Sequence, residues 1–179
     1  MHVFIKNGLN ACAVKPSLRL LEMGFGTGLN AALTFKQKPL KQSVHYISLE
    51  AFPLSRDECE EWIKCNPNEN YEELHQAKWN EPVELNKGFK LEKIEADLLQ
   101  TELPTNLDLV YYDAFGPRVQ PELWTLEVFE KLYKAMNIGG VLVTYSAKGS
   151  VRRNMIAAGF NVERLPGPPG KREMLRARK

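Results

Sequence analysis

The sequence predicts an α/β protein with a mostly parallel sheet, helices on both faces and an antiparallel strand at the C-terminal end. Three observations lead to this fold class. Short apolar runs alternate with segments of helical periodicity, which is typical of a parallel sheet with crossover helices. An acidic residue follows several of these apolar runs. The last two strand patterns have no helix between them, so we expect them to form an antiparallel hairpin.

The first half of the chain contains two strands, two helices and a polar excursion. The apolar run Leu18–Leu21 predicts the first strand, and Pro39 ends the helix that follows it. Ser55 can cap an acidic helix, because Glu58 completes a capping box. Asn66–Lys90 is polar and contains two prolines, so we expect helix and loop there. The other elements predicted in this half are a helix over Leu29–Gln37, a strand over Val44–Leu49 and a helix over Ser55–Lys64.

The second half alternates strands and helices up to the final hairpin. Apolar residues recur at helical spacing over Leu123–Met136. The glycine pair in Asn137–Gly140 is typical of a helix terminator, so we expect the next strand to begin at Val141. A turn rich in proline and glycine, 166–170, separates the last two strands. The strands predicted here are Leu91–Ile94, Leu107–Tyr112, Val141–Tyr145, Phe160–Leu165 and Arg172–Ala177, with a helix over Gly149–Ala158.

A glycine loop follows the first predicted strand. Gly24, Gly26 and Gly28 are spaced by two residues, and a helix starts near Leu29. Glycines let the backbone approach a ligand closely, and the first helical turn offers free N–H groups. The spacing differs from the G-x-G-x-x-G loop that holds a dinucleotide pyrophosphate. We therefore expect S-adenosylmethionine (SAM) rather than NAD, with Glu22 as a polar partner of its amino-acid end; the alternative is a plain turn.

Four acidic residues fall at or just after the carboxyl ends of predicted strands. They are Glu22, Glu50, Asp97 and Asp113. Open α/β sheets bind ligands at this edge. Glu50, placed 22 residues after the last loop glycine, is expected to accept the ribose hydroxyls of a nucleoside, the alternative being an exposed acid of the following helix. Asp97 is either a partner of the adenine amine or a turn residue.

The segment Asp113-Ala-Phe-Gly-Pro117 follows an almost wholly apolar strand. Asp113 should emerge from that strand into the crevice, where a carboxylate can accept a proton from an amine or orient it. Phe115 offers a flat face on which an extruded base can stack, and Pro117 stiffens the turn. The alternative is an aspartate that bonds its own turn, with Phe115 in the core. We favour catalysis by Asp113.

Charge is distributed unevenly along a chain whose net charge is only +2. Residues 50–79 hold eight acids and three bases, whereas residues 148–179 hold nine bases and two acids. A basic C-terminal segment is what an RNA backbone requires, but it is also what an ordinary solvated surface looks like. The charge counts alone favour the ordinary surface.

Length and composition narrow the class of protein. The 179 residues, 44% of them hydrophobic, predict one soluble domain with a full core. No apolar run is long enough to cross a membrane, and the N-terminus does not resemble a signal peptide. Cys12, Cys59 and Cys65 lack a C-x-x-C pair or a histidine cluster, so we expect reduced cytoplasmic thiols with no disulfide and no metal site.

Several motifs occur together in a fixed order, and as a set they resemble one family. They resemble the SAM-dependent methyltransferase domain of the MnmC family, which in some bacteria is fused to an FAD oxidase and in others stands alone. The resemblance runs from about His2 to the C-terminus. The motifs are Glu22-Met-Gly-Phe-Gly-Thr-Gly-Leu-Asn30, Ile47-Ser-Leu-Glu-Ala-Phe-Pro-Leu54, Asp113-Ala-Phe-Gly-Pro117, Leu123-Trp-Thr125, Gly139-Gly140, Val151-Arg-Arg153, Ala158-Gly-Phe160 and Lys171-Arg-Glu-Met-Leu175.

The resemblance implies a Rossmann-like class I methyltransferase fold and a tRNA substrate. Family members methylate the aminomethyl nitrogen at C5 of a wobble uridine, converting 5-aminomethyl-2-thiouridine to 5-methylaminomethyl-2-thiouridine. By position, Asp113 would lie beside the amine, Phe115 would touch the base, and Lys171 and Arg172 would face the tRNA or close the pocket. The cofactor-binding residues that the resemblance implies are Glu22, Gly24, Phe25, Gly26, Thr27, Gly28 and Glu50. From their places in the sequence, Asn30 and Asp97 are also expected to bind the cofactor, and Pro117 the substrate.

The chain also departs from the family pattern. No second domain is present, so we expect a stand-alone, monomeric form that needs no flavin and no membrane. Family members carry a further segment before the part that matches His2–Ile5, and this segment is expected to be missing here. The alternative functions are SAM-dependent methylation of another amine, or a non-catalytic module of the same fold that binds a nucleoside or RNA.

Overall fold

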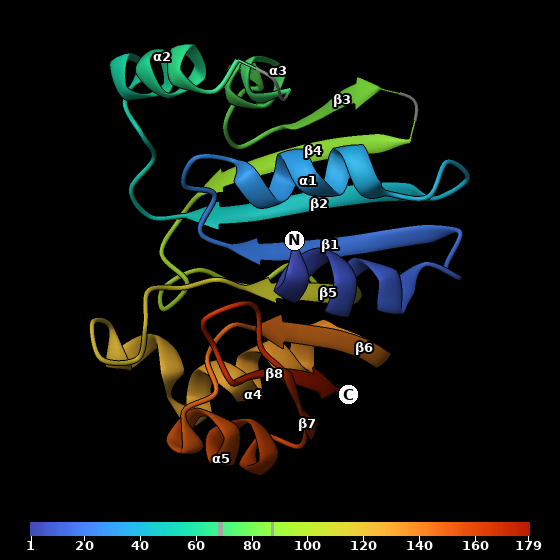
Figure 1. Ribbon diagram of the computed structural model, residues 1–179, viewed down its shortest axis with the longest axis vertical. Helices are drawn as coiled ribbons and strands as arrows, with labels where there is room; N and C mark the ends of the chain where they lie inside the picture. The colour runs from blue at the N-terminus through green and yellow to red at the C-terminus, as the bar shows by residue number, and fades with distance from the viewer. Residues whose placement is uncertain (68–69, 87) are drawn as a thin grey trace.

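A single mixed sheet organises the molecule. The computed structural model describes residues 1–67, 70–86 and 88–179. In this part of the chain the sheet has eight strands in the order β3-β4-β2-β1-β5-β6-β8-β7 (Figure 1). The strands are β1 (Ser17–Met23), β2 (Ser43–Glu50), β3 (Pro82–Asn86), β4 (Phe89–Glu95), β5 (Leu107–Tyr112), β6 (Met136–Thr144), β7 (Asn161–Pro166) and β8 (Glu173–Arg178).

The five central strands are parallel, and the expected C-terminal hairpin is antiparallel. β1 pairs in parallel with both β2 and β5, and the parallel pairing continues to β4 on one side and to β6 on the other. β8 runs antiparallel to β6 and to β7. The predicted fold class is therefore confirmed. The chain leaves β1 towards β2 and later returns to β5, so strand order reverses between β1 and β5, where such sheets bind ligands.

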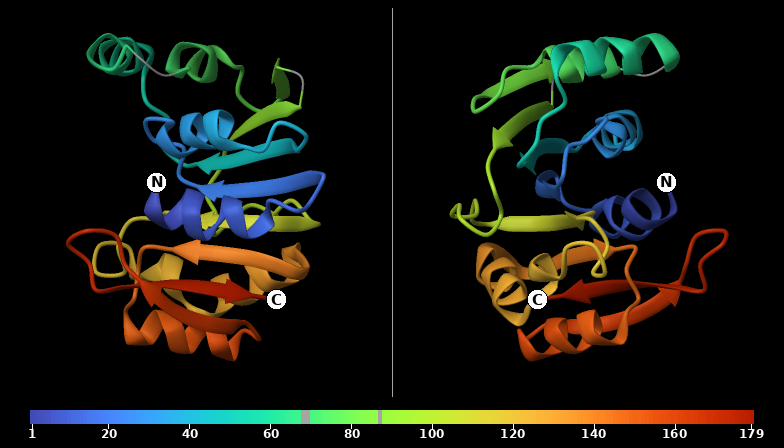
Figure 2. Two further views of the ribbon diagram at one scale, coloured as in Figure 1. Left: turned by 45° about the vertical axis from the view of Figure 1, so that its right-hand side comes forward. Right: turned by 90° about the vertical axis from the view of Figure 1, so that its left-hand side faces the viewer.

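Helices cover the two faces of the sheet (Figure 2). Leu18 and Leu20 of β1 pack in the core under α1 and α3, whereas Leu21 and Met23 pack in the core under α4 and α5. Because side chains alternate along a strand, a central strand buried on both sides is apolar along its length. The helices are α1 (Leu29–Gln37), α2 (Arg56–Cys65), α3 (Tyr71–Gln76), α4 (Leu126–Ala135) and α5 (Gly149–Ala157).

The start of α2 has the predicted capping box. The Ser55 hydroxyl accepts from the Glu58 amide at 3.3 Å, and the Glu58 carboxylate accepts from the Ser55 amide at 2.8 Å. Each side chain thus satisfies a backbone donor that the first helical turn leaves free. This local sequence signal was sufficient to place the helix.

The excursion over Asn66–Lys90 contains a strand that we did not expect. α3 supplies the helix, but Pro82–Asn86 forms the edge strand β3, antiparallel to β4. Val83 and Leu85 pack against the core while the residues between them face outward, so the strand is apolar at alternate positions only. Residues 68–69 and 87 of the expected excursion lie outside the described residues.

Two boundaries around α4 also differ from the expectation. The predicted helix over Leu123–Met136 begins instead at Leu126, because a 3₁₀ turn over Pro121–Trp124 comes first and Thr125 is extended. Asn137–Gly140 belongs to β6 rather than to a loop. Gly139 has a φ of +78° there, which lets the strand continue past an irregularity in its pairing with β5.

The N-terminal residues form two short helical turns that pack on the sheet. They cover His2–Lys6 and Leu9–Cys12, and Val3, Phe4 and Leu9 are buried in the core beside α1. Among the described residues, no helix has both the length and the apolar character to span a bilayer.

Candidate active site

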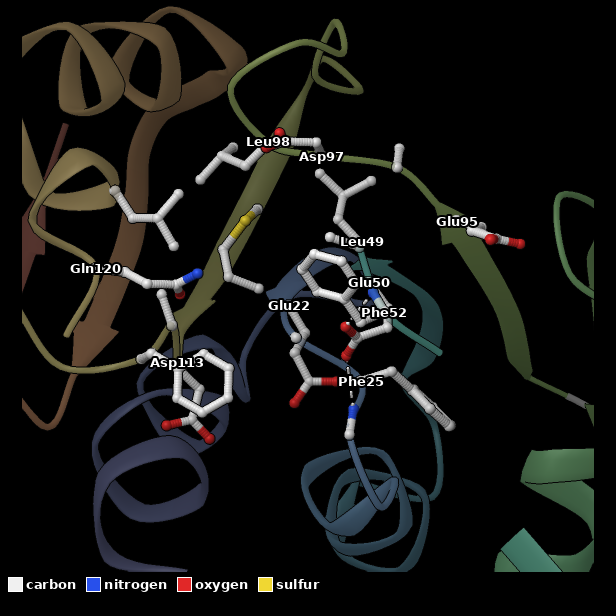
Figure 3. Close-up of a pocket in the computed structure, with 18 of the residues that line it drawn as sticks. Glu22, Phe25, Leu49, Glu50, Phe52, Glu95, Asp97, Leu98, Asp113 and Gln120 are labelled. Carbon is white, nitrogen blue, oxygen red and sulfur yellow. Dashed lines mark hydrogen bonds between the residues drawn. The ribbon is translucent and has the colours of Figure 1, made fainter. Parts of the chain in front are cut away.

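A cavity of about 780 Å³ lies at the end of the sheet where the parallel strands finish, which we call the carboxyl edge (Figure 3). It is lined by residues that follow β1, β2, β4 and β5. Its volume is within the usual range for small-molecule sites. The residues that line it from the predicted set are Glu22, Gly24, Phe25, Gly26, Thr27, Asn30, Glu50, Asp97, Asp113 and Phe115.

The glycine loop opens directly onto this cavity. Gly24 and Gly26 have φ values of +85° and +50°, and a Cβ on either would meet no atom within 4 Å. Both positions therefore need glycine for conformation and leave open space beside the backbone. Gly28 has a φ of +77°, and a Cβ there would lie 3.2 Å from the Phe25 ring. Gly28 thus serves the packing of the loop and does not line the cavity.

Phe25 supports the loop from beneath. Its side chain is buried and packs edge-on against His75 and Trp79, with ring centroids 5.4 and 6.0 Å apart. The Lys93 ammonium lies 5.2 Å from the centre of the Phe25 ring, and burial lowers its pKa to about 8. His75 Nε2 lies 3.1 Å from the Thr27 carbonyl oxygen. These contacts fix the loop against α3 and β4 and turn the Phe25 ring away from the cavity.

Glu50, the last residue of β2, joins the loop to the second strand. Its carboxylate accepts from the Gly26 amide at 3.0 Å and from the Phe52 amide at 2.9 Å. Each oxygen accepts one backbone hydrogen bond and retains a further lone pair, and Glu50 lines the cavity. A carboxylate held in this way is oriented to accept two neighbouring hydroxyl groups, as a ribose offers them.

Asp97, two residues after β4, is a turn residue that also lines the cavity. Its carboxylate accepts from the Leu99 amide at 2.8 Å and from the Gln100 side chain at 3.3 Å. Asp97 and Leu98 lie on the far side of the cavity from Asp113 (Figure 3). The two interpretations left open for Asp97 are therefore compatible, because a carboxylate oriented by its own turn still has free lone pairs.

Glu22 is buried inside β1, with 1% of its surface exposed. Ser48 donates to its carboxylate at 3.3 Å. Burial raises the pKa of Glu22 to about 8, since the charged form loses its hydration. The carboxyl group is therefore largely protonated at neutral pH until a cation or a further donor reaches it.

Asp113 is held by Asn30 from the first turn of α1. The Asn30 side-chain amide donates to Asp113 Oδ2 at 2.9 Å. Burial raises the pKa of Asp113 to about 6, and the Asn30 hydrogen bond and the Lys171 charge oppose this rise. Above pH 6 the group is mostly ionised, so it can accept a proton. Asn30, expected to bind cofactor, thus also contacts the candidate catalytic residue.

The remaining predicted residues come from the loop after β5 and from the turn between β7 and β8. Phe115 lines the cavity with 69% of its surface exposed. Lys171 lies over the Tyr145 ring, with its ammonium 4.2 Å from the ring centre. Pro117 is half-buried and Arg172 is exposed, and neither lines the cavity.

Most of the chain matches the model of a known protein family. The model of a family described as S-adenosyl-L-methionine-dependent methyltransferase matches residues 58–179. The chain belongs to this family of methyltransferases. Its cofactor is S-adenosyl-L-methionine, as the glycine loop predicted.

Two similar relatives share one name. The tRNA 5-methylaminomethyl-2-thiouridine biosynthesis bifunctional protein MnmC of Ectopseudomonas mendocina is 31% identical over 97% of this chain, and that of Leptospira borgpetersenii is 34% identical over 87%. The resemblance to MnmC methyltransferase domains is thereby confirmed. The chain spans only 29% and 26% of these two relatives.

A solved structure supports the fold assignment. MNMC2 from Aquifex aeolicus superimposes with a TM-score of 0.69 at 24% identity, covering 98% of this methyltransferase and 57% of that chain. At this identity the likeness concerns the fold. It confirms the Rossmann-like architecture that the alternating strands and helices predicted.

The cavity of this methyltransferase fits its cofactor. The open space beside Gly24 and Gly26 admits an extended chain close to the backbone, and Glu22 and Glu50 offer carboxyl groups at separate points. We expect Glu22 and the loop at the methionine end, Glu50 at the ribose, and Asp97 with Leu98 at the adenine. Among the described residues, no cluster of side chains suits a metal ion.

Sequence reasoning missed three residues that shape the site. Phe52 lines the cavity with 80% of its surface exposed, and Gln120 lines it beside Asp113. Tyr145 donates to the Ala114 carbonyl at 2.9 Å, and its ring lies under the Lys171 ammonium. Phe52 gave a signal, being an aromatic residue two positions after Glu50, the acid expected to bind the ribose. Tyr145 gave none, because its partners lie 26 or more residues away.

Proposed function

We propose that this methyltransferase acts on the aminomethyl nitrogen of a wobble uridine in tRNA. The reaction converts 5-aminomethyl-(2-thio)uridine to 5-methylaminomethyl-(2-thio)uridine. The names of the relatives, at 31% and 34% identity, support this substrate. We propose that a single domain carries this activity. We also propose that the protein works in the cytoplasm, where tRNA matures.

The observation that carries the proposal is the environment of Asp113. A primary amine is protonated at neutral pH and is not a nucleophile until it loses that proton. SAM supplies an electrophilic methyl group, so the protein must orient the amine and remove its proton. A carboxylate with a pKa near 6, held at one oxygen by Asn30, keeps its other oxygen available for the amine.

Phe115 completes the substrate end of the cavity. Its ring is exposed. Its backbone is fixed, because the Trp124 indole donates to the Phe115 carbonyl at 2.8 Å. An exposed aromatic ring beside a catalytic carboxylate is suited to stack an unpaired base. Phe115 therefore places C5 of the uridine, and with it the aminomethyl group, next to Asp113.

The direct test is mass spectrometry of nucleosides from tRNA that carries 5-aminomethyluridine at the wobble position, after incubation with SAM and the protein. We expect the wobble nucleoside to gain one methyl group and other nucleosides to stay unchanged. The matched control is the same tRNA with an unmodified wobble uridine, which lacks the amine. A folded, SAM-binding protein that leaves both tRNAs unchanged would refute the proposal and favour another amine as substrate.

A further inference from the structure

The nine basic residues of the C-terminal segment fall into two groups in space. One group makes ion pairs or hydrogen bonds within the fold. The Arg176 guanidinium is 2.9 Å and that of Arg178 is 3.6 Å from Glu163, Arg164 is 3.8 Å from Glu173, and Lys179 donates to two carbonyl groups at 2.7 Å. All four lie on the final hairpin, β7 and β8 with the residue that follows. These four side chains are already engaged in contacts within the fold, although two carboxylates do not fully balance their charge.

The other group makes no ion pair among the described residues, although the Lys171 charge acts on nearby Asp113. Five residues of the segment and one residue of the loop after β5 form no ion pair within 4.0 Å in the part of the chain that the structure describes. Arg152 in addition has a buried Nε that lacks a hydrogen-bond partner. We call this group the basic rim. It consists of Arg118, Lys148, Arg152, Arg153, Lys171 and Arg172.

The basic rim comes from three segments that meet at the carboxyl edge beside Asp113. They are the loop after β5, the start of α5 and the turn between β7 and β8 (Figures 1 and 2). Tyr145 connects the loop after β5 to the turn between β7 and β8. Its hydroxyl donates to the Ala114 carbonyl, and its ring lies under the Lys171 ammonium. α5 is connected to the 3₁₀ turn that follows the loop after β5, because the Asn154 side chain donates to the Trp124 carbonyl at 2.8 Å.

The opposite end of the sheet has the reverse charge. α2 and α3 lie beyond β4, away from β5–β8, and their acids are exposed (Figure 1). A polyanion that approaches the cavity is therefore attracted on the Asp113 side and repelled on the α2 side. The exposed acids of these two helices include Asp57, Glu58, Glu60, Glu61, Glu72 and Glu73.

We propose that the basic rim binds the phosphates of the RNA substrate, so that the RNA lies over the β5–β6–β8–β7 half of the carboxyl edge and away from α2 and α3. This rests on the proposed function, because it assumes an RNA substrate at the cavity. It assigns binding to Arg118, Lys148, Arg152 and Arg153 in addition to Lys171 and Arg172. With the backbone held there, a splayed base enters the cavity past Phe115.

The test measures RNA binding by fluorescence anisotropy with a labelled anticodon stem–loop RNA over a series of KCl concentrations. Each phosphate contact contributes about 0.7–0.9 to the slope of log affinity against log salt. The test variant is Arg153→Glu with Arg172→Glu, both exposed residues of the rim. The matched control is Lys41→Glu with Lys64→Glu, two exposed residues outside the rim that give the same change in net charge.

We expect the rim variant to lose at least about tenfold in RNA affinity at low salt, with a salt slope shallower by about 1.4–1.8. The control should stay within about twofold of the wild type, and both variants should bind S-adenosylhomocysteine normally. An equal loss in both variants, or no loss in the rim variant, would overturn the proposed docking face.

The two measurements together distinguish a wrong docking face from a wrong substrate. If the wild type methylates tRNA while the rim variant binds RNA as tightly as the wild type does, only the docking face is wrong. If the wild type binds the cofactor but neither binds nor methylates tRNA, the RNA substrate itself is wrong. Arg118→Glu alone, a third exposed rim position, repeats the comparison at a smaller change in charge.

Discussion

At the scale of single residues, the site depends on contacts between groups far apart in the sequence. Asn30 and Asp113 are separated by 83 residues and meet at 2.9 Å. The sequence placed both near the ligand, because each follows a strand that ends at the same edge. It did not reveal that one holds the other, since a pairwise contact of this kind depends on strand order and register rather than on local pattern.

Replacing Asn30 separates its two possible roles. The Asn30 hydrogen bond lowers the pKa of Asp113, so Asn30→Ala should raise that pKa from about 6. The acid limb of the rate of methyl transfer should then move to higher pH. The measurement is the pH profile of kcat/KM together with S-adenosylhomocysteine affinity. A weaker affinity with an unmoved profile would show that Asn30 binds the cofactor and does not position Asp113.

Replacing Glu50 tests the ribose contact. Glu50→Ala removes a charged acceptor, so cofactor affinity should fall by about 1.5–3 kcal/mol, the scale of hydrogen bonds to a charged group. Calorimetry with S-adenosylhomocysteine measures this loss. Glu95→Ala is the control, because Glu95 also lines the cavity but ends the neighbouring strand β4. Equal losses at both positions would remove the special role of Glu50.

At the scale of elements, local signals placed most of the sheet and the helices. β1, β2 and β5 are buried on both faces, so their apolar runs were plain. β3 was missed because an edge strand buries only alternate residues, and Val83 and Leu85 are few among polar neighbours. The N-terminal turns were missed because five and four residues span little more than one helical period, so no apolar spacing can recur.

The glycine loop gives a prediction at this scale. Gly28→Ala places a Cβ at a φ of +77° and 3.2 Å from the Phe25 ring, so it should destabilise the fold by about 1–2 kcal/mol and weaken cofactor binding. The comparison is Gly139→Ala, with a φ of +78° but open space around its Cβ, far along the chain in β6. Denaturant unfolding should show a loss of stability in both variants.

Cofactor affinity distinguishes the two glycine variants. It should fall for Gly28→Ala and remain unchanged for Gly139→Ala, because only Gly28 lies in the loop that opens onto the cavity. If both variants bind S-adenosylhomocysteine like the wild type, the loop conformation does not determine the binding site.

At the scale of the whole molecule, the fold places two acids of different protonation at one edge. Burial holds the pKa of Glu22 at about 8 and that of Asp113 at about 6. Environments that give two carboxyl groups different pKa values suit them to different roles. The sequence showed that the acids would gather at the edge, but their depth, and therefore their protonation, depends on packing that only the folded structure determines.

We propose that Asp113 deprotonates and orients an amine in the SAM-binding cavity. The measurement is the initial rate of methyl transfer to tRNA carrying 5-aminomethyluridine, for the wild type and for Asp113→Ala and Asp113→Asn, alongside S-adenosylhomocysteine affinity. Both variants should bind the cofactor and fold normally, while Asp113→Ala should lower the rate by roughly 10²–10⁴-fold, the usual contribution of a general base. Near-normal methylation by Asp113→Ala would rule out this catalytic role and leave Asp113 as a residue of the turn.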